Sequence, residues 1–555
     1  MKRIMKKMRR SLSDIISNLP ESVKETILAC LPIQDAVRTS VLSTKWRYTW
    51  TKLPQLVFDD TFCSDLFCKT KDKLMTIIYQ VLLFHHGPIP KFTCSLSGLK
   101  SCSEFDQLIL FVSKKGIQEL NLNIQNGELY KLPSSLFSCL QLKILTLHSC
   151  IFKSPPEFKG FSRLLKLELY EVVVTADILS RLISSSPLLE RLSLQNSTSI
   201  DCLEINAPNL RFLLCEIHAG SICLKNTVQL ASIAIGLMAS MDEFTLLIEK
   251  GEPYKLPSSL FSCEQLRYLS LRSCVFKSPP EFKGFSRLLK LALYRVFVAS
   301  DTLSSLISSC PLLEKLSLKR SFSSDCLEIN TPNLRFLACE IYGSSISLKN
   351  TTRLARVSIC FMGIFNAEGI TQAETSKLVM LFGSLPVVEF LLLDYHTIRY
   401  MSAGGVPKRL PTTLNNLKTL KLLSICFEEV NEISVILCLI RSSPNLEEIT
   451  IVVRRCETAD VIDHVPQLLE MQDWSDVSLN QLQVVELGNL SGTQSELKFI
   501  GLLLAISPVL ETMFIQTDSE KVADKGLRIL TEVTRFPRWS PHAEIKFEYK
   551  DKDQV

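Results

Sequence analysis

The segment LKILTL, from Leu142 to Leu147, carries the pattern L-x-x-L-x-L, which recurs along most of the chain with apolar substitutions. Early occurrences lie 20 to 25 residues apart, and later ones are more widely spaced. A regular pattern of this kind predicts one short strand per repeat, with a helix or an irregular crossover behind it. The last apolar position of the pattern falls at Leu122, Leu147, Leu169, Leu194, Cys215, Ile235, Leu271, Leu293, Leu318, Cys339, Ile359, Leu393, Leu422, Ile451, Leu487 and Ile515.

A single repeat of this kind cannot fold alone. Burying its leucines contributes about 2 kcal/mol per side chain. Ordering the twenty or so residues of the repeat costs on the order of 1 kcal/mol or more for each residue. Neighbouring repeats must therefore stack into one continuous core. Period and pattern together predict an α/β leucine-rich-repeat solenoid.

A long internal duplication lies within the repeats. Residues Gly127–Thr227 return as Gly251–Thr351 at a constant offset of 124, without a gap, and 26 of the 101 aligned positions differ. Inserting whole repeats without a gap leaves the stacking register intact, which is why a solenoid accepts such a change. A functional duplication, a neutral one and an error of sequence assembly all fit this pattern.

The differences between the two copies concentrate at positions that we expect to face outward. In L-x-x-L-x-L the third and fifth positions and the residue after the pattern alternate onto the concave side of the strand. The four repeats of each copy contain twelve such outward positions. Seven of these twelve differ between the copies, whereas only 19 of the remaining 89 aligned positions differ. The second copy gains Arg272 and Lys319 and carries Ala292 in place of Glu168. Drift of an exposed surface is one explanation.

The direction of these changes favours a second explanation. We expect the second copy to present a more basic surface and to contact a more acidic part of a partner. The candidate partner-binding residues are His148, Glu168, Arg191, Gln195, Tyr268, Arg272, Lys315 and Lys319.

Before the repeats lies an unrepeated stretch, LPESVKETILACLPIQDAVRTSVLSTKWRYTW, running from Leu19 to Trp50. Val23, Ile27 and Leu31 follow one another at i, i+4 and i+8 and predict an apolar stripe on a first helix. Pro32 is expected to end that helix, because proline lacks the N–H that the helix interior needs.

Polar residues in this stretch predict where the helices begin. Asn18 is expected to cap the first helix and Asp35 the second, because their side chains accept hydrogen bonds from unpaired N–H groups. Ser43 is expected to open a third turn that carries Trp46 and Trp50 on one face.

This stretch resembles a known family. Its pattern LP…IL..LP…(V/A)R.S.LS.KW..W is similar to the F-box, the segment by which F-box proteins dock on the Skp-type adaptor of a cullin-based ubiquitin ligase. An ordinary small helical domain is the alternative. The resemblance implies that the adaptor-binding residues are Leu19, Pro20, Ile27, Leu28, Leu31, Pro32, Val37, Leu42, Ser43, Lys45, Trp46 and Trp50.

The end of the chain also resembles a family module. The stretch LNQLQVVELGNLSGTQSELKFIGLLLAISPVLETMFI and the later ILTEVTRFPRWSPHAEIKFEYK are similar to the FBD module at the end of many plant F-box proteins. Family members usually carry one copy of the block that is doubled here. The domain order expected is a basic tail over 1–12, the F-box over 13–55, a bridging region over 56–110, the leucine-rich-repeat solenoid over 111–474 and the FBD module over 475–550.

Composition argues against several other classes of protein. A net charge of +5 over 555 residues is too mild for a protein whose main activity is nucleic-acid binding. The longest apolar run, from Phe499 to Ile506, is far shorter than the roughly 20 residues of a membrane span, so we expect no membrane segment. The 19 cysteines are scattered rather than arranged as a disulfide framework. They predict reduced thiols in a cytoplasmic or nuclear protein.

The sequence predicts no catalytic residue, no metal and no cofactor. It contains no HExxH, nucleophile elbow, P-loop or GxGxxG motif. A zinc site is a minor alternative, because cysteines and histidines gather in one region without the paired short spacings of structural zinc sites. The residues concerned are Cys63, Cys68, His85, His86, Cys94 and Cys102.

The resemblance implies a non-catalytic subunit of a ubiquitin ligase. In this reading the F-box holds a Skp-type adaptor and through it a cullin, and the repeats with the FBD module hold a target protein for ubiquitination. The alternative is a non-degradative interaction protein that recruits or sequesters the adaptor. The identity of the target is not encoded in any motif of the sequence.

Overall fold

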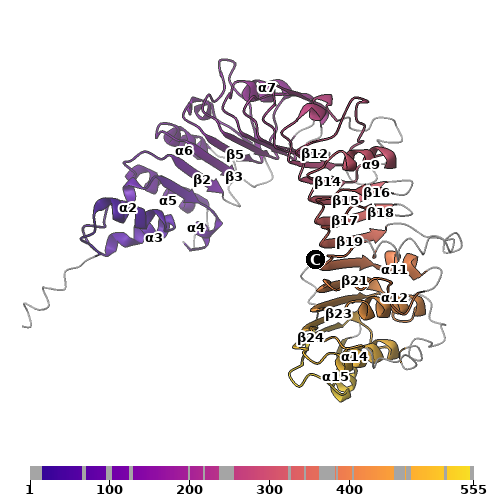
Figure 1. The fold of residues 1–555 in the computed structure, drawn as a ribbon. Helices are drawn as coiled ribbons and strands as arrows, with labels where there is room; N and C mark the ends of the chain where they lie inside the picture. Colours follow the sequence, from indigo (N-terminus) through magenta and orange to yellow (C-terminus); the bar gives the residue numbers. More distant parts are fainter. Residues whose placement is uncertain are drawn as a thin grey trace, which may run out of the picture. The chain divides into compact units, whose positions relative to one another are not determined.

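The structure, a computed structural model, divides into two compact units, Met1–Leu266 and Arg267–Val555 (Figure 1). Each unit is described by itself. The residues that the structure describes are 16–65, 71–95, 103–123, 129–197, 200–216, 219–236, 256–322, 327–342, 346–361, 382, 385–402, 406–454, 469, 477–517 and 522–549.

The first unit opens with short helices that begin directly after prolines. Pro20 and Pro32 precede them with φ of −53°, and neither helix has a side-chain cap. Proline sets the entry to a helix through its fixed φ, so no polar cap is needed there. The elements are α2 (Glu21–Ala29), α3 (Ile33–Arg38), η1 (Thr39–Val41) and η2 (Thr49–Lys52).

Both capping predictions were therefore wrong. The Asn18 side chain instead accepts a hydrogen bond from Lys45 Nζ. Asp35 lies inside α3 and forms an ion pair with Arg38 at 2.8 Å. The first helix ends at Ala29, ahead of the proline expected to end it.

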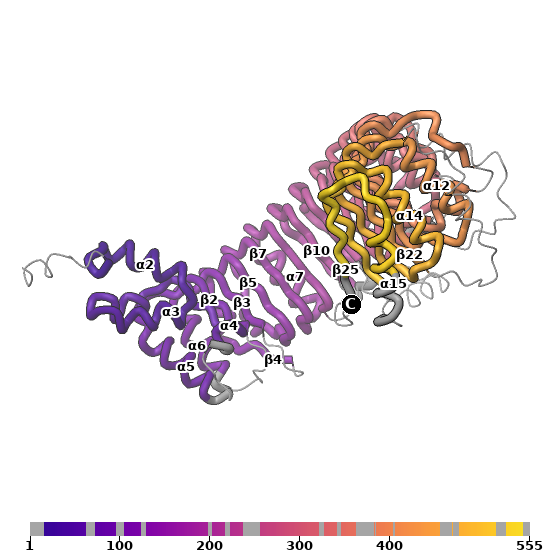
Figure 2. Tube along the Cα trace, turned by 90° about the horizontal axis from the view of Figure 1, so that it is seen from below, coloured from indigo at the N-terminus to yellow at the C-terminus, as the bar shows by residue number. Residues whose placement is uncertain are grey.

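A parallel sheet runs through the first unit, each strand pairing with the next (Figure 2). It already begins in the predicted bridging region. The strands are β1 (Gln55–Phe58), β2 (Lys91–Ser95), β3 (Glu119–Asn123), β5 (Ile144–His148), β7 (Lys166–Tyr170), β8 (Arg191–Gln195), β10 (Phe212–Glu216) and β12 (Ser232–Gly236).

The second unit contains a parallel sheet of the same kind, with helices standing on one side of its strands (Figure 1). Its strands are β13 (Tyr268–Arg272), β14 (Lys290–Tyr294), β15 (Lys315–Phe322), β17 (Phe336–Tyr342), β19 (Arg356–Phe361), β20 (Phe390–Asp394), β21 (Thr419–Ile425), β22 (Glu448–Val453), β23 (Val484–Leu490), β24 (Thr512–Thr517) and β25 (Glu544–Tyr549).

The predicted solenoid pattern is confirmed strand by strand. Each predicted last apolar position lies in a strand and is buried, and these positions face one another in register within each unit, as Leu147 faces Leu169. The neighbouring positions alternate outward, as a strand's period of two requires. The core is thus a continuous stack of leucine-type side chains.

Several strands are followed or interrupted by a residue with left-handed backbone. Glycine and asparagine adopt this conformation at low cost, and other residues adopt it only with strain. The non-glycine residues concerned, with φ between 48° and 62°, are Ser149, Glu171, Asn196, Asn226, Ser273, Arg295, Arg320, Asn350, Ser424 and Asn489.

The crossovers behind the strands are either helices or short extended pieces. Three small parallel pairs, β9 with β11, β16 with β18, and β4 with β6, replace helices in some repeats. The pieces are α4 (Asp60–Asp65), α5 (Lys71–Phe84), α6 (Ser103–Ser113), β4 (Tyr130–Lys131), η3 (Ser134–Ser138), β6 (Cys150–Ile151), α7 (Ala176–Ser184), β9 (Ile200–Asn206), β11 (Ala219–Lys225), η4 (Ser258–Ser262), α9 (Ser300–Ser308), β16 (Leu327–Asn330), β18 (Ile346–Lys349), α11 (Tyr395–Ser402), α12 (Val430–Arg441), α14 (Gln494–Ile506) and α15 (Val522–Arg535).

The region predicted to be the FBD module continues the sheet of the second unit. β23 pairs with β22 and is followed by β24 and β25 in the same parallel order. Thr493 and Glu496 form a capping box at the start of α14. The module is therefore joined to the repeats by backbone hydrogen bonds.

The described cysteines are free, and most of them are buried. Burial raises the pKa of Cys139 and Cys263 to about 11 and that of Cys150 and Cys274 to about 12. These thiols fill apolar space in the way the sequence predicts. No described helix is both long and apolar enough to cross a bilayer.

Candidate functional site

An apolar stripe along α2 and the residues directly after it faces solvent. Val23, Ile27 and Leu31 are 40 %, 39 % and 38 % exposed, whereas Leu28 on the other side of the helix is fully buried. The i, i+4 spacing places Val23 and Ile27 on one face of α2, and Leu31 follows directly after the helix ends. The predicted stripe therefore exists, but it points out of the domain and leaves only Leu28 to the core.

A second exposed apolar pair follows α3. Val41 is 87 % exposed and Leu42 is 67 % exposed. The turn after them is tied to the segment before α2, because Ser17 Oγ donates to Ser43 Oγ at 3.0 Å and Lys45 donates to the Asn18 side chain. These hydrogen bonds give the turn a defined position beside α2.

The two tryptophans are part of the domain's core. Trp46 is 3 % exposed and Trp50 is 8 % exposed. The ammonium group of Lys24 lies 6.0 Å from the centre of the Trp46 ring. The resemblance places Trp46 among the adaptor-binding residues, but its burial leaves it almost no surface to offer a partner, so in the structure it packs the core.

The twelve predicted adaptor-binding residues fall into three classes by solvent exposure. Leu28, Trp46 and Trp50 are buried, and Leu19, Val37 and Ser43 are half-buried. Those that are exposed are Pro20, Ile27, Leu31, Pro32, Leu42 and Lys45. Val23 and Val41, which the predicted set lacked, are also exposed apolar side chains of this segment. The sequence placed Val23 on the same predicted stripe as Ile27 by its spacing, although it was not in the adaptor-binding set.

The candidate partner-binding residues of the first copy lie on the outward side of β5, β7 and β8. Glu168 accepts a hydrogen bond from Thr146 Oγ1 at 3.0 Å and forms an ion pair with Lys166 at 2.9 Å. The His148 ring lies 5.4 Å from the Tyr170 ring, and burial lowers the pKa of this histidine. The first copy thus holds its carboxylate in local contacts.

The second copy places basic groups over aromatic rings at the same positions. The Arg272 guanidinium lies 4.9 Å from the centre of the Tyr294 ring, and Lys290 Nζ lies 4.8 Å from that of Tyr268. Lys319 forms an ion pair with Glu340 at 3.4 Å. Ala292 occupies the position that Glu168 has in the first copy.

Zinc is not supported by the residues that the structure describes. They contain no group of three or more metal-ligating side chains. His85 is buried, its Nε2 lies 2.8 Å from the Leu53 carbonyl, and desolvation lowers its pKa. The side chains of Cys63, Cys68 and Cys102 lie outside the described part of the chain.

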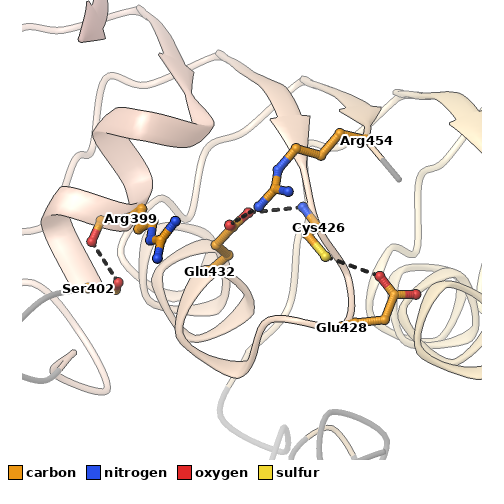
Figure 3. A network of polar contacts seen from close by, with 6 residues as sticks. All are labelled: Arg399, Ser402, Cys426, Glu428, Glu432 and Arg454. Atoms are coloured by element: carbon orange, nitrogen blue, oxygen red, sulfur yellow. Dashed lines mark hydrogen bonds and ion pairs between the residues drawn. The ribbon is translucent and has the colours of Figure 1, made fainter. Parts of the chain in front are cut away.

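A buried ion pair in the second unit is structural (Figure 3). Glu432 accepts from Arg454 Nη2 at 2.7 Å and from the Cys426 backbone N–H at 2.9 Å. Burial raises the pKa of Glu432, although its two donors oppose this effect. The pair joins the end of β22 to α12 and to the turn after β21.

Fold and site together define a leucine-rich-repeat protein with an N-terminal segment that exposes an apolar helical stripe. The F-box domain family model matches residues 16–57. The family model described as "FBD-associated F-box protein At5g56370, LRR repeats" matches residues 105–244 and 237–451. The chain belongs to the F-box/FBD/LRR-repeat protein family.

Two similar proteins of Arabidopsis thaliana are named F-box/FBD/LRR-repeat proteins. The chain is 32 % identical over 541 residues to F-box/FBD/LRR-repeat protein At1g13570, covering 96 % of this chain and 98 % of that protein. It is 28 % identical over 341 residues to putative F-box/FBD/LRR-repeat protein At5g56810, covering 56 % of this chain and 76 % of that protein. A plant peptide hormone receptor, RGFR1 in complex with RGF2, aligns with a TM-score of 0.39 at 14 % identity, covering 83 % of this chain and 68 % of the receptor chain.

Proposed function

We propose that this protein is the substrate-recognition subunit of a Skp/cullin/F-box ubiquitin ligase. The F-box docks a Skp-type adaptor, and the repeats with the FBD region hold a target protein. The observation that carries the proposal is the exposed apolar stripe of Val23, Ile27 and Leu31, in the segment that the F-box family model matches.

An exposed stripe of this kind has a physical cost that a partner removes. Burying an exposed aliphatic side chain completely is worth about 1.5–3 kcal/mol. A helix that presents such a stripe at i, i+4 spacing suits an apolar groove on another protein. Val41 and Leu42, after α3, are further exposed apolar side chains of the same segment.

The chemical gain of such a subunit is proximity. Holding a target beside a charged ubiquitin carrier turns a bimolecular encounter into an effectively intramolecular one. No residue of this chain has to take part in bond making. A ligase subunit of this kind works in the cytoplasm or nucleus, where the cysteines stay reduced.

The docking step is tested with exposed residues, because truncating a buried tryptophan also damages the fold. An Ile27→Ala, Leu31→Ala variant should lose adaptor affinity by about 30-fold or more, since each anchor typically contributes 1 kcal/mol or more. The matched control is Leu140→Ala, Leu188→Ala, whose leucines are 59 % and 46 % exposed outside the F-box. Undiminished adaptor binding by a folded double variant would overturn the proposal.

The ligase reading is separated from adaptor sequestration by a second measurement. A target-binding subunit should co-precipitate adaptor and cullin, and a captured protein should accumulate when proteasomes are blocked. Adaptor binding without cullin, and without any protein that accumulates, would leave the non-degradative interaction protein as the better account.

A further inference from the structure

We propose that the outward face of the second copy, together with the strand that follows it, binds an extended acidic segment of the target protein. The basic strip is defined here as the outward side chains of β13, β14, β15, β17 and β19. This inference rests on the proposed function, because it names the part of the target that the repeats hold. It goes beyond that function by assigning a surface and a chemistry.

Charge on the strip is strongly one-sided. Its outward positions carry five basic residues and one acidic residue, Glu340. The corresponding strands of the first unit are β5, β7, β8, β10 and β12. Their equivalent positions carry two basic and two acidic residues. The strip therefore has an excess of positive charge that the first unit lacks, and this favours an acidic partner. The basic residues are Arg272, Lys290, Lys315, Lys319 and Arg356.

Several of these cations are held in place by aromatic rings. Lys290 lies over Tyr268, Arg272 over Tyr294, and the Arg356 guanidinium lies 4.4 Å from the centre of the Phe390 ring. A ring covers the flat face of a guanidinium without using the N–H groups at its edge. Those edge groups are the ones that hydrogen-bond carboxylates in pairs.

Lys290 and Lys315 occupy the third position of the L-x-x-L-x-L pattern in β14 and β15, and their charges are not neutralised by an ion pair in the described part of the chain. Across the described segments of the chain, neither Lys290 nor Lys315 forms an ion pair. Both are exposed. In the first copy, by contrast, Lys166 at the position of Lys290 is paired with Glu168. The second copy has therefore lost the carboxylate that would compete with a ligand.

The middle row of the strip leaves room for a backbone. Strand pairing aligns its members next to one another, each a serine or an alanine. In the first unit the same row contains Glu168 and Leu214, whose side chains stand in the way. The small residues of the strip are Ser270, Ala292, Ser317, Ala338 and Ser358.

Strand spacing sets the length of the bound segment. Neighbouring strands lie about 4.8 Å apart, and an extended chain rises about 3.3 Å per residue. Four intervals between five strands therefore correspond to about six extended residues. The strip fits an extended segment of that length with several aspartates or glutamates, flanked by the basic residues on both sides.

The experiment uses the full chain in complex with its adaptor and a defined probe. The probe is a labelled peptide of alternating aspartate and glycine, about ten residues long so that it spans the strip. Fluorescence anisotropy measures its dissociation constant. Binding should weaken as salt rises, because exposed charge pairs are screened. A peptide with asparagine in place of aspartate should not bind.

Variants locate the binding to the strip. Arg272→Glu with Lys319→Glu should weaken the acidic peptide by at least about tenfold. The matched control in the first copy, Arg191→Glu with His148→Glu, should change it by less than about twofold. A glutamate at position 319 would lie beside Glu340, the ion-pair partner of Lys319, and would repel it. The milder Arg272→Gln, Lys319→Gln variant avoids this repulsion and should also weaken peptide binding.

Several outcomes overturn the proposal. Equal losses from both copies, or none from either, leave drift as the account of the second copy. A single-stranded oligonucleotide that binds the strip as tightly as the peptide points to nucleic acid instead. Adaptor binding is measured on the same variants. Lost peptide binding with normal adaptor binding supports the strip, whereas an adaptor that never binds the wild-type chain removes the proposed function and leaves the peptide result standing.

Discussion

The two copies of the duplicated block are nearly the same fold with different surfaces. Strand β5 of the first copy and β13 of the second occupy equivalent residues, as do helices α7 and α9. Buried leucines are retained between the copies, whereas Glu168 and His148 become Ala292 and Arg272. The core tolerates few changes, since neighbouring repeats share it. The outward face has no such constraint.

The largest expected effect tests whether the two copies share the same backbone constraint. Gly160 and Gly284 have φ of 90° and 93°, and an added Cβ would lie 2.3 Å from the Cβ of Ser185 or Ser309. Gly160→Ala and Gly284→Ala should each destabilise the chain by about 3 kcal/mol, through strain and overlap together. Thermal unfolding of each variant measures this.

The control for this pair is Gly116→Ala. Gly116 also has a positive φ, of 71°, but nothing lies within 4 Å of an added Cβ. Strain alone should cost about 1 kcal/mol there. If either copy tolerates alanine as well as position 116 does, the close approach in that copy is absent and the two copies are not equivalent.

The next effect concerns thiols that both copies bury alike. Cys139 and Cys263, with pKa of about 11, form one pair, and Cys150 and Cys274, with pKa of about 12, form another. At pH 8 their thiolate fractions are small, so native labelling should be about a hundredfold slower than labelling after denaturation. Mass spectrometry should find both pairs as free thiols. Native disulfides would contradict this prediction and the ligase reading.

A smaller effect concerns one left-handed position that the two copies share, directly after β8 in the first copy and at the register shift inside β15 in the second. Asn196 and Arg320 are equivalent, with φ of 49° and 50°. Asparagine adopts this conformation more readily than arginine. Arg320→Asn should therefore stabilise the protein by about 0.5–1 kcal/mol, and Asn196→Arg should destabilise it by a similar amount. Asn226 and Asn350, which keep asparagine in both copies, provide the reference for denaturant midpoints.

The smallest effect is a pH dependence that only the first copy has. Burial lowers the pKa of His148 in the folded state, against the opposing charges of Glu168 and Glu171. Below the unfolded pKa of about 6.5, the unfolded chain binds more protons, so this group lowers stability as pH falls through that window. The contribution should be less than about 1 kcal/mol, because the ring is partly exposed.

His148→Gln should remove this contribution, and Arg272→Gln in the second copy should not alter the pH profile. The comparison is made between thermal unfolding at pH 7.5 and at pH 5.5. A profile that is the same with and without His148 would show that the histidine titrates alike in both states.

Much of the fold follows from the sequence because leucine periodicity is a local signal. The positions from Leu122 to Ile515 were predicted as strand cores and are buried in strands. The pattern did not reveal β1, β2 or β25, in which Phe58 and Cys94 are buried and Phe547 is half-buried. Each of these strands pairs in parallel with a neighbouring strand, and a local sequence pattern does not record such pairing.

The sequence by itself determined the repeat register, the duplication and the F-box resemblance, because each is written in residue type and spacing. The tertiary structure decided which side of each pattern is free. The stripe of Val23, Ile27 and Leu31 is equally compatible with a core face or a docking face until Leu28 and Trp46 are seen to occupy the interior. Burial depends on what packs against a side chain, and that information comes from residues distant in sequence.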